Sequence, residues 1–237
     1  MEMRLNKYLS EAGVCSRREA DRMIEQGKVY IDGKVANMGQ KVTPDNVVTV
    51  NGKQIKNNSD FILLALNKPE GIECTTSKDN PDNIVDFVGY KTRIYPIGRL
   101  DKNSCGLILL TNKGDISDKM MRASNYHEKE YIVTVNKDIT EEFILKMSNG
   151  VKLYDEEHKI DLTTRKCLVK INGKRTFTIC LTQGINRQIR RMCAAFGYDV
   201  IKLKRIRIMN IKLNALPVGK YRSIENEELE QLLNSLK

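Results

Sequence analysis

A chain of 237 residues can hold one good core, or a medium domain with a small companion. Its longest apolar run, residues 61–66, is much shorter than the roughly 20 residues that cross a bilayer, and the first ten residues lack the apolar core of a signal peptide. We therefore expect a cytoplasmic protein with no membrane partner. The formal net charge of +10 favours a polyanionic binding partner.

The positive charge is concentrated near the C-terminal end of the chain. Residues 187–222 contribute +9, residues 1–56 contribute +3 and the tail 223–237 contributes −3. In the stretch "KLKRIRIMNIKL" cations alternate with apolar residues, which at the period of a strand places Lys202 and Lys204 on one open face, with Arg205 and Arg207 as further candidates for it. This pattern favours nucleic acid as the partner.

The first fifty residues predict two helices followed by a hairpin. Ser16 suits the N-cap of the second helix, with Glu19 as its capping-box partner, and Gly27 ends that helix. Asp32 and Gly33 are typical of a two-residue hairpin turn.

This segment resembles the S4 RNA-binding domain, through "RLNKYL", "SRREA" and "GKVYIDGKV". The resemblance implies a small αL-type module over residues 1–56 that binds structured RNA through cations on its helices. The candidate RNA-binding residues of this module are Arg4, Lys7, Arg17, Arg18 and Arg22.

A polar linker over residues 54–60 separates this module from a larger region, residues 61–237. We expect strands at 61–69, 107–111, 131–135, 167–171, 176–182 and 200–213, and helices near 115–122, 140–147, 186–196 and 223–236. Asn172 and Gly173 lie at the centre of a predicted hairpin. Several hairpins and few β-α-β units predict an α+β fold with a mostly antiparallel sheet and flanking helices.

Three separate segments carry residues suited to one active site. Asp101 follows Arg99 just before an apolar strand, Tyr131 opens another strand, and Asn186 caps a helix that bears several arginines. On that helix Arg187 and Arg190 are three residues apart and share a face, so one of their guanidinium groups is placed to hold a carboxylate. An aspartate before a strand is also an ordinary turn residue, and adjacent arginines can exchange roles.

Other chemistries have little support. The six cysteines include no C-x-x-C pair, so we expect no metal site and no cofactor. His127 and His158 lie in polar stretches without a neighbouring serine or cysteine motif, so we expect them at the surface and expect no hydrolase triad. No glycine-rich phosphate loop is present.

The stretch "GRLDKNSCGLILLTNKGD" resembles the main motif of pseudouridine synthases of the RsuA family, "HEKEY" matches the K-x-Y block of that family, and "QGINRQIRRM" matches its third block. An S4 domain ahead of the catalytic core is also the layout of this family. The chain is most similar to the branch that acts on large-subunit (23S) ribosomal RNA. The resemblance implies a cofactor-free isomerase that works as a monomer and requires no metal.

The resemblance assigns roles to individual residues. Asp101 would be the nucleophile, attacking the ribose anomeric carbon or the uracil ring; Tyr131 would stack on the uracil, and Arg190 would pair with Asp101. Arg99 would aid extrusion of the base, and the remaining RNA contacts would come from Arg187, Arg191, Lys202, Lys204 and Arg205. Two alternatives stay open: a uridine of transfer RNA as substrate, and a non-catalytic S4-type ribosome-assembly factor.

Overall fold

The computed structural model describes residues 2–56, 60–155 and 159–236. The chain divides into two compact units: one contains residues 1–62, 90–94 and 112–114, and the other contains 63–89, 95–111 and 115–237. Residues 57–59 of the predicted linker, and His158, lie outside the described residues. In the part of the chain that is described, no helix is both long and apolar enough to cross a membrane.

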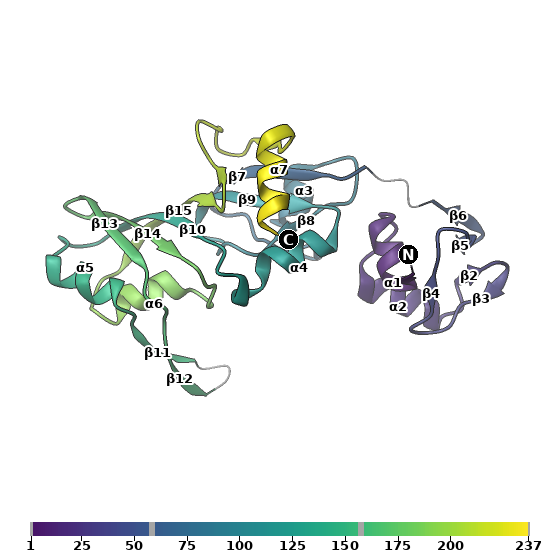
Figure 1. Cartoon of the computed structure of the whole chain (residues 1–237), viewed down its shortest axis with the longest axis horizontal. Coiled ribbons are helices and arrows are strands. Elements are labelled where there is room, and N and C mark those ends of the chain that lie inside the picture. Colours follow the sequence, from purple (N-terminus) through teal and green to yellow (C-terminus); the bar gives the residue numbers. More distant parts are fainter. Residues whose placement is uncertain (1, 57–59, 156–158, 237) are drawn as a thin grey trace. The chain divides into compact units, whose positions relative to one another are not determined.

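The first unit contains two helices and two small sheets (Figure 1). Its elements are β1 (Met3–Arg4), α1 (Leu5–Glu11), α2 (Arg17–Glu25), β2 (Val29–Ile31), β3 (Lys34–Val35), β4 (Lys41–Val42), β5 (Val48–Val50) and β6 (Lys53–Ile55). Strands β3, β2, β5 and β6 form an antiparallel sheet, and β1 pairs with β4. Apolar residues of both helices, among them Leu9 and Ile24, pack with residues of the sheet in one core.

Local signals in this unit act as the sequence predicts. The Ser16 hydroxyl accepts a hydrogen bond from the backbone N–H of Glu19 over 3.1 Å, which caps α2. Gly27 follows α2 with φ +66°, and Asp32 and Gly33 turn the β2–β3 hairpin with φ +49° and +78°. The left-handed backbone at these positions explains why glycine and aspartate occupy them.

The second unit is built on a nine-stranded sheet, with strand order β13-β14-β10-β15-β9-β7-β17 and with β16 and β8 added beside β15 and β9. Its strands are β7 (Leu63–Lys68), β8 (Tyr95–Ile97), β9 (Cys105–Thr111), β10 (Lys129–Val135), β13 (Leu168–Gly173), β14 (Thr176–Leu181), β15 (Val200–Ile208), β16 (Ile211–Lys212) and β17 (Tyr221–Ser223). A separate hairpin joins β11 (Lys152–Asp155) and β12 (Ile160–Thr163). Within the main sheet the pairing of β9 with β15 is parallel and the other pairings are antiparallel, which confirms the predicted α+β class.

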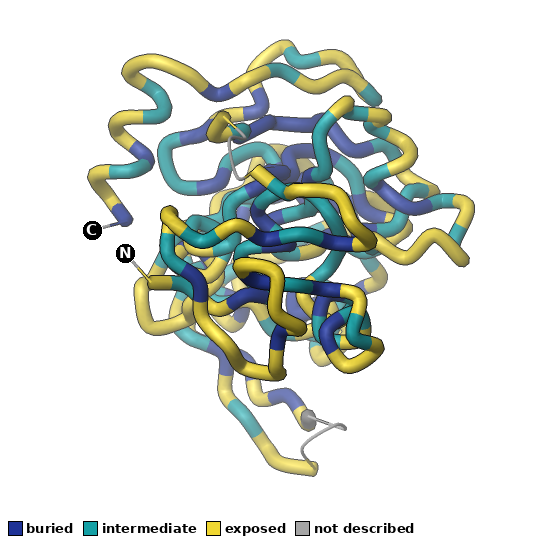
Figure 2. The backbone as a smooth tube through the Cα atoms, turned by 90° about the vertical axis from the view of Figure 1, so that its right-hand side faces the viewer, coloured by how far each residue is buried: buried dark blue, intermediate teal, exposed yellow. Residues whose placement is uncertain are grey.

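Helices cover the two halves of this sheet and complete two cores. The helical elements are α3 (Ile84–Val88), α4 (Gly114–Met121), the 3-10 turn η1 (Ala123–Asn125), α5 (Glu141–Ser148), α6 (Gln188–Ala194) and α7 (Asn226–Ser235). Phe143 of α5 and Met192 of α6 pack on β10 and β14, whereas Met120 of α4 and Leu232 of α7 pack on β7 and β9. Buried residues accordingly gather along the strands, and exposed residues lie mainly in the connecting loops (Figure 2).

Several details differ from the prediction. The elements α3, β8, β11, β12 and β17 were not predicted, because each is short and lacks a full period of apolar residues. The hairpin predicted to turn at Asn172-Gly173 turns two residues later, because Gly173 pairs with Thr176 beyond a bulge and leaves Lys174 and Arg175 as the turn.

Candidate active site

A cavity of about 1080 Å³ opens in the second unit beside the parallel pairing of β9 and β15. Its wall is made from the loop between β8 and β9, the segment that runs from the end of α4 into β10, and the loop before α6. The lining includes Arg99, Asp101, Tyr131, Arg187 and Arg205. The three segments singled out in the sequence therefore meet at one place.

Asp101 lies in the β8–β9 loop at the edge of this cavity. Its backbone carbonyl accepts a hydrogen bond from the N–H of Ser104 over 3.0 Å, which closes a tight turn just before β9. The side chain is 28% exposed, and its Oδ2 atom lies 3.5 Å from Nη1 of Arg187 and 3.6 Å from Nε of Arg190. The carboxylate is thus held open to the cavity between two cations.

Arg190 is the more firmly held of these cations. Its side chain is 12% exposed. Its Nη1 donates to the carbonyl of Val200 over 2.9 Å, and its Nη2 donates to the carbonyl of Asn103 over 3.0 Å and to Oγ of Ser104 over 3.3 Å. Its Nε has no hydrogen-bond partner among the described residues and faces Asp101. Because the fold fixes two of the three nitrogens, the guanidinium charge stays in place beside the carboxylate.

Arg187 reaches Asp101 from a less constrained position. It is the N-cap of α6, with φ +49° and a side chain that is 47% exposed. The prediction that Asn186 caps this helix is wrong, since α6 begins at Gln188. The N-cap residue Arg187 makes no capping hydrogen bond through its side chain, and the buried side chain of Gln188 accepts a hydrogen bond from the N–H of Ile185 in the preceding loop over 3.2 Å.

Arg191 turns away from the cavity. Its Nη1 donates to the carbonyl of Asn186 over 3.4 Å, and its Nη2 donates to the carbonyl of Tyr154 on β11. The guanidinium of Arg191 therefore joins α6 to the β11–β12 hairpin. Of the three arginines that could have paired with the Asp101 carboxylate, Arg187 and Arg190 lie beside it.

Tyr131 lies in β10 and lines the cavity with a half-buried ring. Its backbone pairs with Ile179 of β14 and with Arg205 of β15, so the ring projects from the interior of the sheet. The guanidinium carbon of Arg205 lies 6.0 Å from the ring centroid. The ring is therefore held by the sheet, as a stacking surface for a flat substrate requires.

The cations of β15 do not all lie on one open surface. Arg205 is 3% exposed, and its Nε donates to the carbonyl of Leu107 over 2.7 Å, so its placement on an open surface with the lysines is wrong. Strand alternation explains the error, because Arg205 shares a face with buried Leu203. Lys202 is exposed and Lys204 is half-buried, and neither lines the cavity.

Arg99 and His127 also line the cavity. The side chain of Arg99 is 75% exposed, and its Nη2 lies 3.9 Å from Oε1 of Glu73. His127, expected at the surface, is half-buried in the cavity wall, where burial lowers the pKa of its imidazole.

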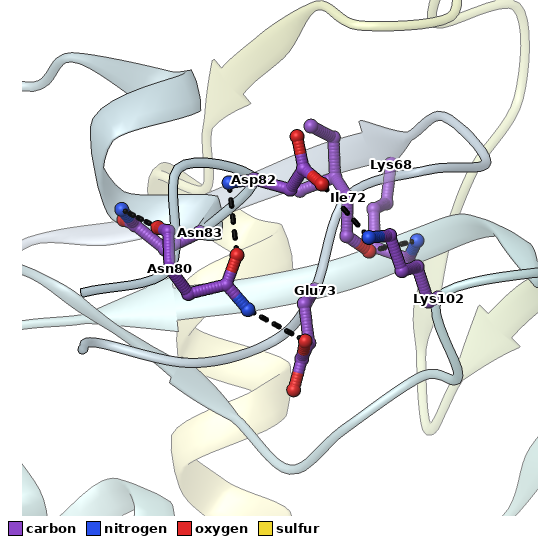
Figure 3. A network of polar contacts seen from close by, with 7 residues as sticks. All are labelled: Lys68, Ile72, Glu73, Asn80, Asp82, Asn83 and Lys102. Carbon is purple, nitrogen blue, oxygen red and sulfur yellow. Dashed lines mark hydrogen bonds and ion pairs between the residues drawn. The ribbon is translucent and has the colours of Figure 1, made fainter. Parts of the chain in front are cut away.

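A network of polar contacts braces the loop that carries Asp101, as Figure 3 shows. The buried Lys68 donates through Nζ to the carbonyls of Pro69 over 2.8 Å and Ile72 over 2.7 Å, and burial lowers its pKa. The N–H of Gly71 then donates to the carbonyl of Lys102 over 2.8 Å, and Nζ of Lys102 lies 2.8 Å from Asp82.

The segment that follows β7 is folded on itself by the same network. Asn80 donates to Glu73 over 2.7 Å and accepts from the N–H of Asp82 over 2.9 Å, and Asn83 caps α3. The sequence patterns did not predict a role for these residues. The available signal was Lys68, a cation at the end of the apolar run that forms β7.

In the first unit the candidate RNA-binding side chains lie on the helices or just before them. Arg17 and Arg18 are exposed at the start of α2, and Arg4 is exposed at the N-cap of α1. Lys7 lies 3.7 Å from Glu11, and Arg22 lies 3.2 Å from Glu19. The exposed arginines at the start of α2 are therefore the best placed for a phosphate backbone.

Comparison with known proteins identifies the family of the chain. The sequence profile described as RNA pseudouridylate synthase matches residues 62–195, and that of the S4 domain matches residues 3–48. The chain belongs to the RNA pseudouridylate synthase family, and it carries an S4 domain ahead of the synthase region. It is an RNA pseudouridine synthase, as the motifs implied.

Individual relatives cover nearly the whole chain. The dual-specificity RNA pseudouridine synthase RluF of Escherichia coli (strain K12) is 55% identical over 97% of this chain and 78% of the relative. The ribosomal large subunit pseudouridine synthase B of Bacillus subtilis (strain 168) is 38% identical over 97% of this chain and 95% of the relative. A crystal structure of a pseudouridylate synthase superposes with a TM-score of 0.70 at 26% identity, covering 97% of this chain and 99% of the other.

Proposed function

We propose that this protein converts a uridine of large-subunit (23S) ribosomal RNA to pseudouridine in the cytoplasm, as a monomer without a cofactor, and that Asp101 is the nucleophile. The observation that carries the proposal is the Asp101 carboxylate, held within 3.6 Å of Arg187 and Arg190 at the cavity wall. The name of the Bacillus subtilis relative supports the large ribosomal subunit as the source of the RNA.

The chemistry follows from the position of the carboxylate. Asp101 attacks the ribose anomeric carbon or the uracil ring and forms an ester or an adduct. The bond from N1 to the ribose breaks, the base turns, a bond forms from C5 to the ribose, and the bond to Asp101 breaks, which frees the carboxylate. The C5 proton leaves and N1 takes up a proton, so the reaction balances without an oxidant or a second substrate. Arg190 pairs with the Asp101 carboxylate while bound RNA excludes water.

Tyr131 and Arg99 serve the uridine itself. The ring of Tyr131 stacks on the uracil and lies near the C5 proton that must leave. A uridine in folded RNA must first be flipped out of its stack, and Arg99, exposed at the cavity, aids that step.

The two parts of the chain divide the work. Residues 1–56 serve as the RNA-binding domain, through Arg4, Lys7, Arg17, Arg18 and Arg22, and residues 61–237 serve as the catalytic domain. The exposure of Arg17 and Arg18 supports this division, because exposed guanidinium groups suit the backbone of a folded RNA.

The substitution Asp101→Asn tests the nucleophile and the alternative of a non-catalytic assembly factor together. We expect loss of pseudouridine formation, with RNA affinity within about twofold of the wild type, because the amide keeps the shape of the carboxylate but cannot form the covalent bond. Asp118→Asn is the matched control, since Asp118 is exposed on α4 and does not line the cavity. Pseudouridine formed by the Asp101→Asn protein would contradict the assignment.

The RNA is identified by mapping pseudouridines, through carbodiimide adducts that stop reverse transcription, in total RNA from cells with and without the gene. We expect loss of one site in large-subunit ribosomal RNA. The name of the Escherichia coli relative, dual-specificity, favours a second substrate class, and transfer RNA is the candidate. Sites lost only from transfer RNA would contradict the ribosomal assignment and leave the reaction intact.

A further inference from the structure

One wall of the cavity carries a group of positively charged or donor side chains that the reaction at Asp101 does not use. His127, Lys129 and Arg205 all line the cavity. His127 precedes β10, Lys129 is the first residue of β10, and Arg205 lies on β15, the neighbouring strand. We call Lys129 and Arg205 the β10–β15 cation group.

Arg205 is a buried cation without a counter-charge. It is 3% exposed, and its Nη2 has no hydrogen-bond partner among residues 2–56, 60–155 and 159–236. In the same ranges no carboxylate lies within ion-pair distance of Arg205 or Lys129. A buried charge without a partner is costly to a fold, so its presence in a cavity wall indicates a function.

The residues near Arg205 do not compensate its positive charge. Burial, and then the charge of Arg205, lower the pKa of Lys129. The buried Nε2 of His127 has no hydrogen-bond partner in the described part of the chain. The ring of His127 already bonds the backbone of Lys119, so the side chains that lack the acceptor an anion would supply are those of Lys129 and Arg205.

A bulge in the sheet gathers these groups. Glu130 pairs with Arg207 and Tyr131 pairs with Arg205, so Ile206 is the extra residue on β15. The extra residue shifts the alternation, and as a result Arg205 and Ile208 both line the cavity although they are three residues apart.

Asp101 is not the anion that this group lacks. The oxygen of Asp101 lies beside Arg187 and Arg190, and Asp101 makes no ion pair with Arg205 or Lys129 within the described residues. The cavity thus holds a site for a second negative group, and its volume of about 1080 Å³ accommodates a nucleotide with its flanking phosphates.

We propose that the β10–β15 cation group binds a backbone phosphate next to the flipped-out uridine. The phosphates are the anions that an RNA substrate brings into the cavity. Lys129 and Tyr131 are two residues apart on β10, so they face the same side, and Arg205 lies 6.0 Å from the Tyr131 ring. Binding of the phosphate on this wall fixes the ribose while Tyr131 holds the base. The proposal rests on the RNA-modifying reaction and holds whether the RNA is ribosomal or transfer RNA.

A double-mutant cycle, in which Lys129 of the protein and one phosphate of the RNA are replaced separately and together, tests this interaction. The substrate is an RNA oligonucleotide that the full-length wild type converts, made with a neutral methylphosphonate linkage on the 5′ or the 3′ side of the uridine. We expect one neutral linkage to lower kcat/KM of the wild type about tenfold, and to lower that of Lys129→Met less than twofold, because this variant has no ammonium group to pair with the phosphate.

Two further variants keep the test decisive. Lys170→Met, which removes an exposed lysine on β13 outside the cavity, should respond to the neutral linkage as the wild type does. Lys129→Arg keeps the positive charge, so the neutral linkage should again lower kcat/KM by nearly tenfold. A protein that had lost its fold at this position would not recover this response. Equal penalties in the wild type and Lys129→Met, for both linkages, would overturn the proposal. Conversion of the unmodified oligonucleotide by the wild type reports separately on the proposed function.

Discussion

The Nε atom of Arg190 lies 3.6 Å from Oδ2 of Asp101, while the other two nitrogens of the same guanidinium donate to the backbone carbonyls of Val200 and Asn103. The positive charge is therefore fixed by the fold before any substrate enters. Such preorganisation matters most in a site from which the substrate excludes water.

Replacing Arg190 with lysine should lower kcat, because one ammonium group cannot hold both carbonyls and also face Asp101. We expect a loss of about tenfold to one-hundredfold, the equivalent of one hydrogen bond to a charged group, about 1.5–3 kcal/mol. Single-turnover pseudouridine formation measures this loss. Arg191→Lys is the control, because Arg191 binds the Tyr154 carbonyl away from Asp101. A kcat for Arg190→Lys within twofold of the wild type would show that the fixed charge is not needed.

Substitutions at Tyr131 separate stacking from proton transfer. Tyr131→Phe keeps the ring that lines the cavity and removes the hydroxyl, so we expect KM to change little and kcat to fall by about one-hundredfold or more. Tyr131→Leu should also weaken RNA binding, because stacking of an aromatic side chain on a base contributes about 1–3 kcal/mol. Steady-state kinetics and filter binding measure the two effects. Unchanged kcat in Tyr131→Phe would limit the role of Tyr131 to stacking.

Sequence patterns predicted those features of the site that depend on a single helix or strand. Arg187 and Arg190 were predicted to share a face of one helix; Arg187 is instead the N-cap of α6, and both still lie within 3.6 Å of Asp101. The pattern failed at Arg205 because a run of mixed cations shows the alternation of a strand but not which face is buried. Burial depends on β9, which is about one hundred residues away in the chain and accepts the Nε–H of Arg205 at Leu107.

The polar contacts that hold the Asp101 loop could not be predicted from the sequence, for a similar reason. The contacts of Gly71 and Asp82 with Lys102 join the segment between β7 and α3 to the β8–β9 loop, and neither segment has an apolar period that predicts its partner. Local signals such as the Ser16 cap were predicted because donor and acceptor lie three residues apart.

The exposed arginines of the first unit should set the salt dependence of RNA binding. For Arg17→Ala combined with Arg18→Ala, we expect the slope of log K against log salt concentration to become shallower by about 0.7–0.9 for each phosphate that the protein no longer neutralises. Fluorescence anisotropy at several salt concentrations measures the slope. Lys146→Ala serves as the control, because Lys146 lies on α5 and is paired with Glu142 over 2.7 Å. Equal slopes in all three proteins would remove Arg17 and Arg18 from the RNA interface.

Gly106 is the position where the parallel pairing of β9 with β15 depends on a missing side chain. A Cβ atom there would lie 2.2 Å from the backbone oxygen of Arg205, and φ of Gly106 is +100°. Neither the backbone oxygen nor this φ accommodates alanine, so Gly106→Ala should lower the free energy of unfolding by at least about 3 kcal/mol. Gly173→Ala is the matched control, since a Cβ atom at Gly173 meets no described atom within 4 Å and its φ is not left-handed. Urea denaturation should show a change of less than about 1 kcal/mol for the control. Similar midpoints for the two variants would mean that β9 and β15 can separate without loss of the fold. The positions of Asp101 and Arg190, which lie next to these strands in the chain, would then depend on other contacts.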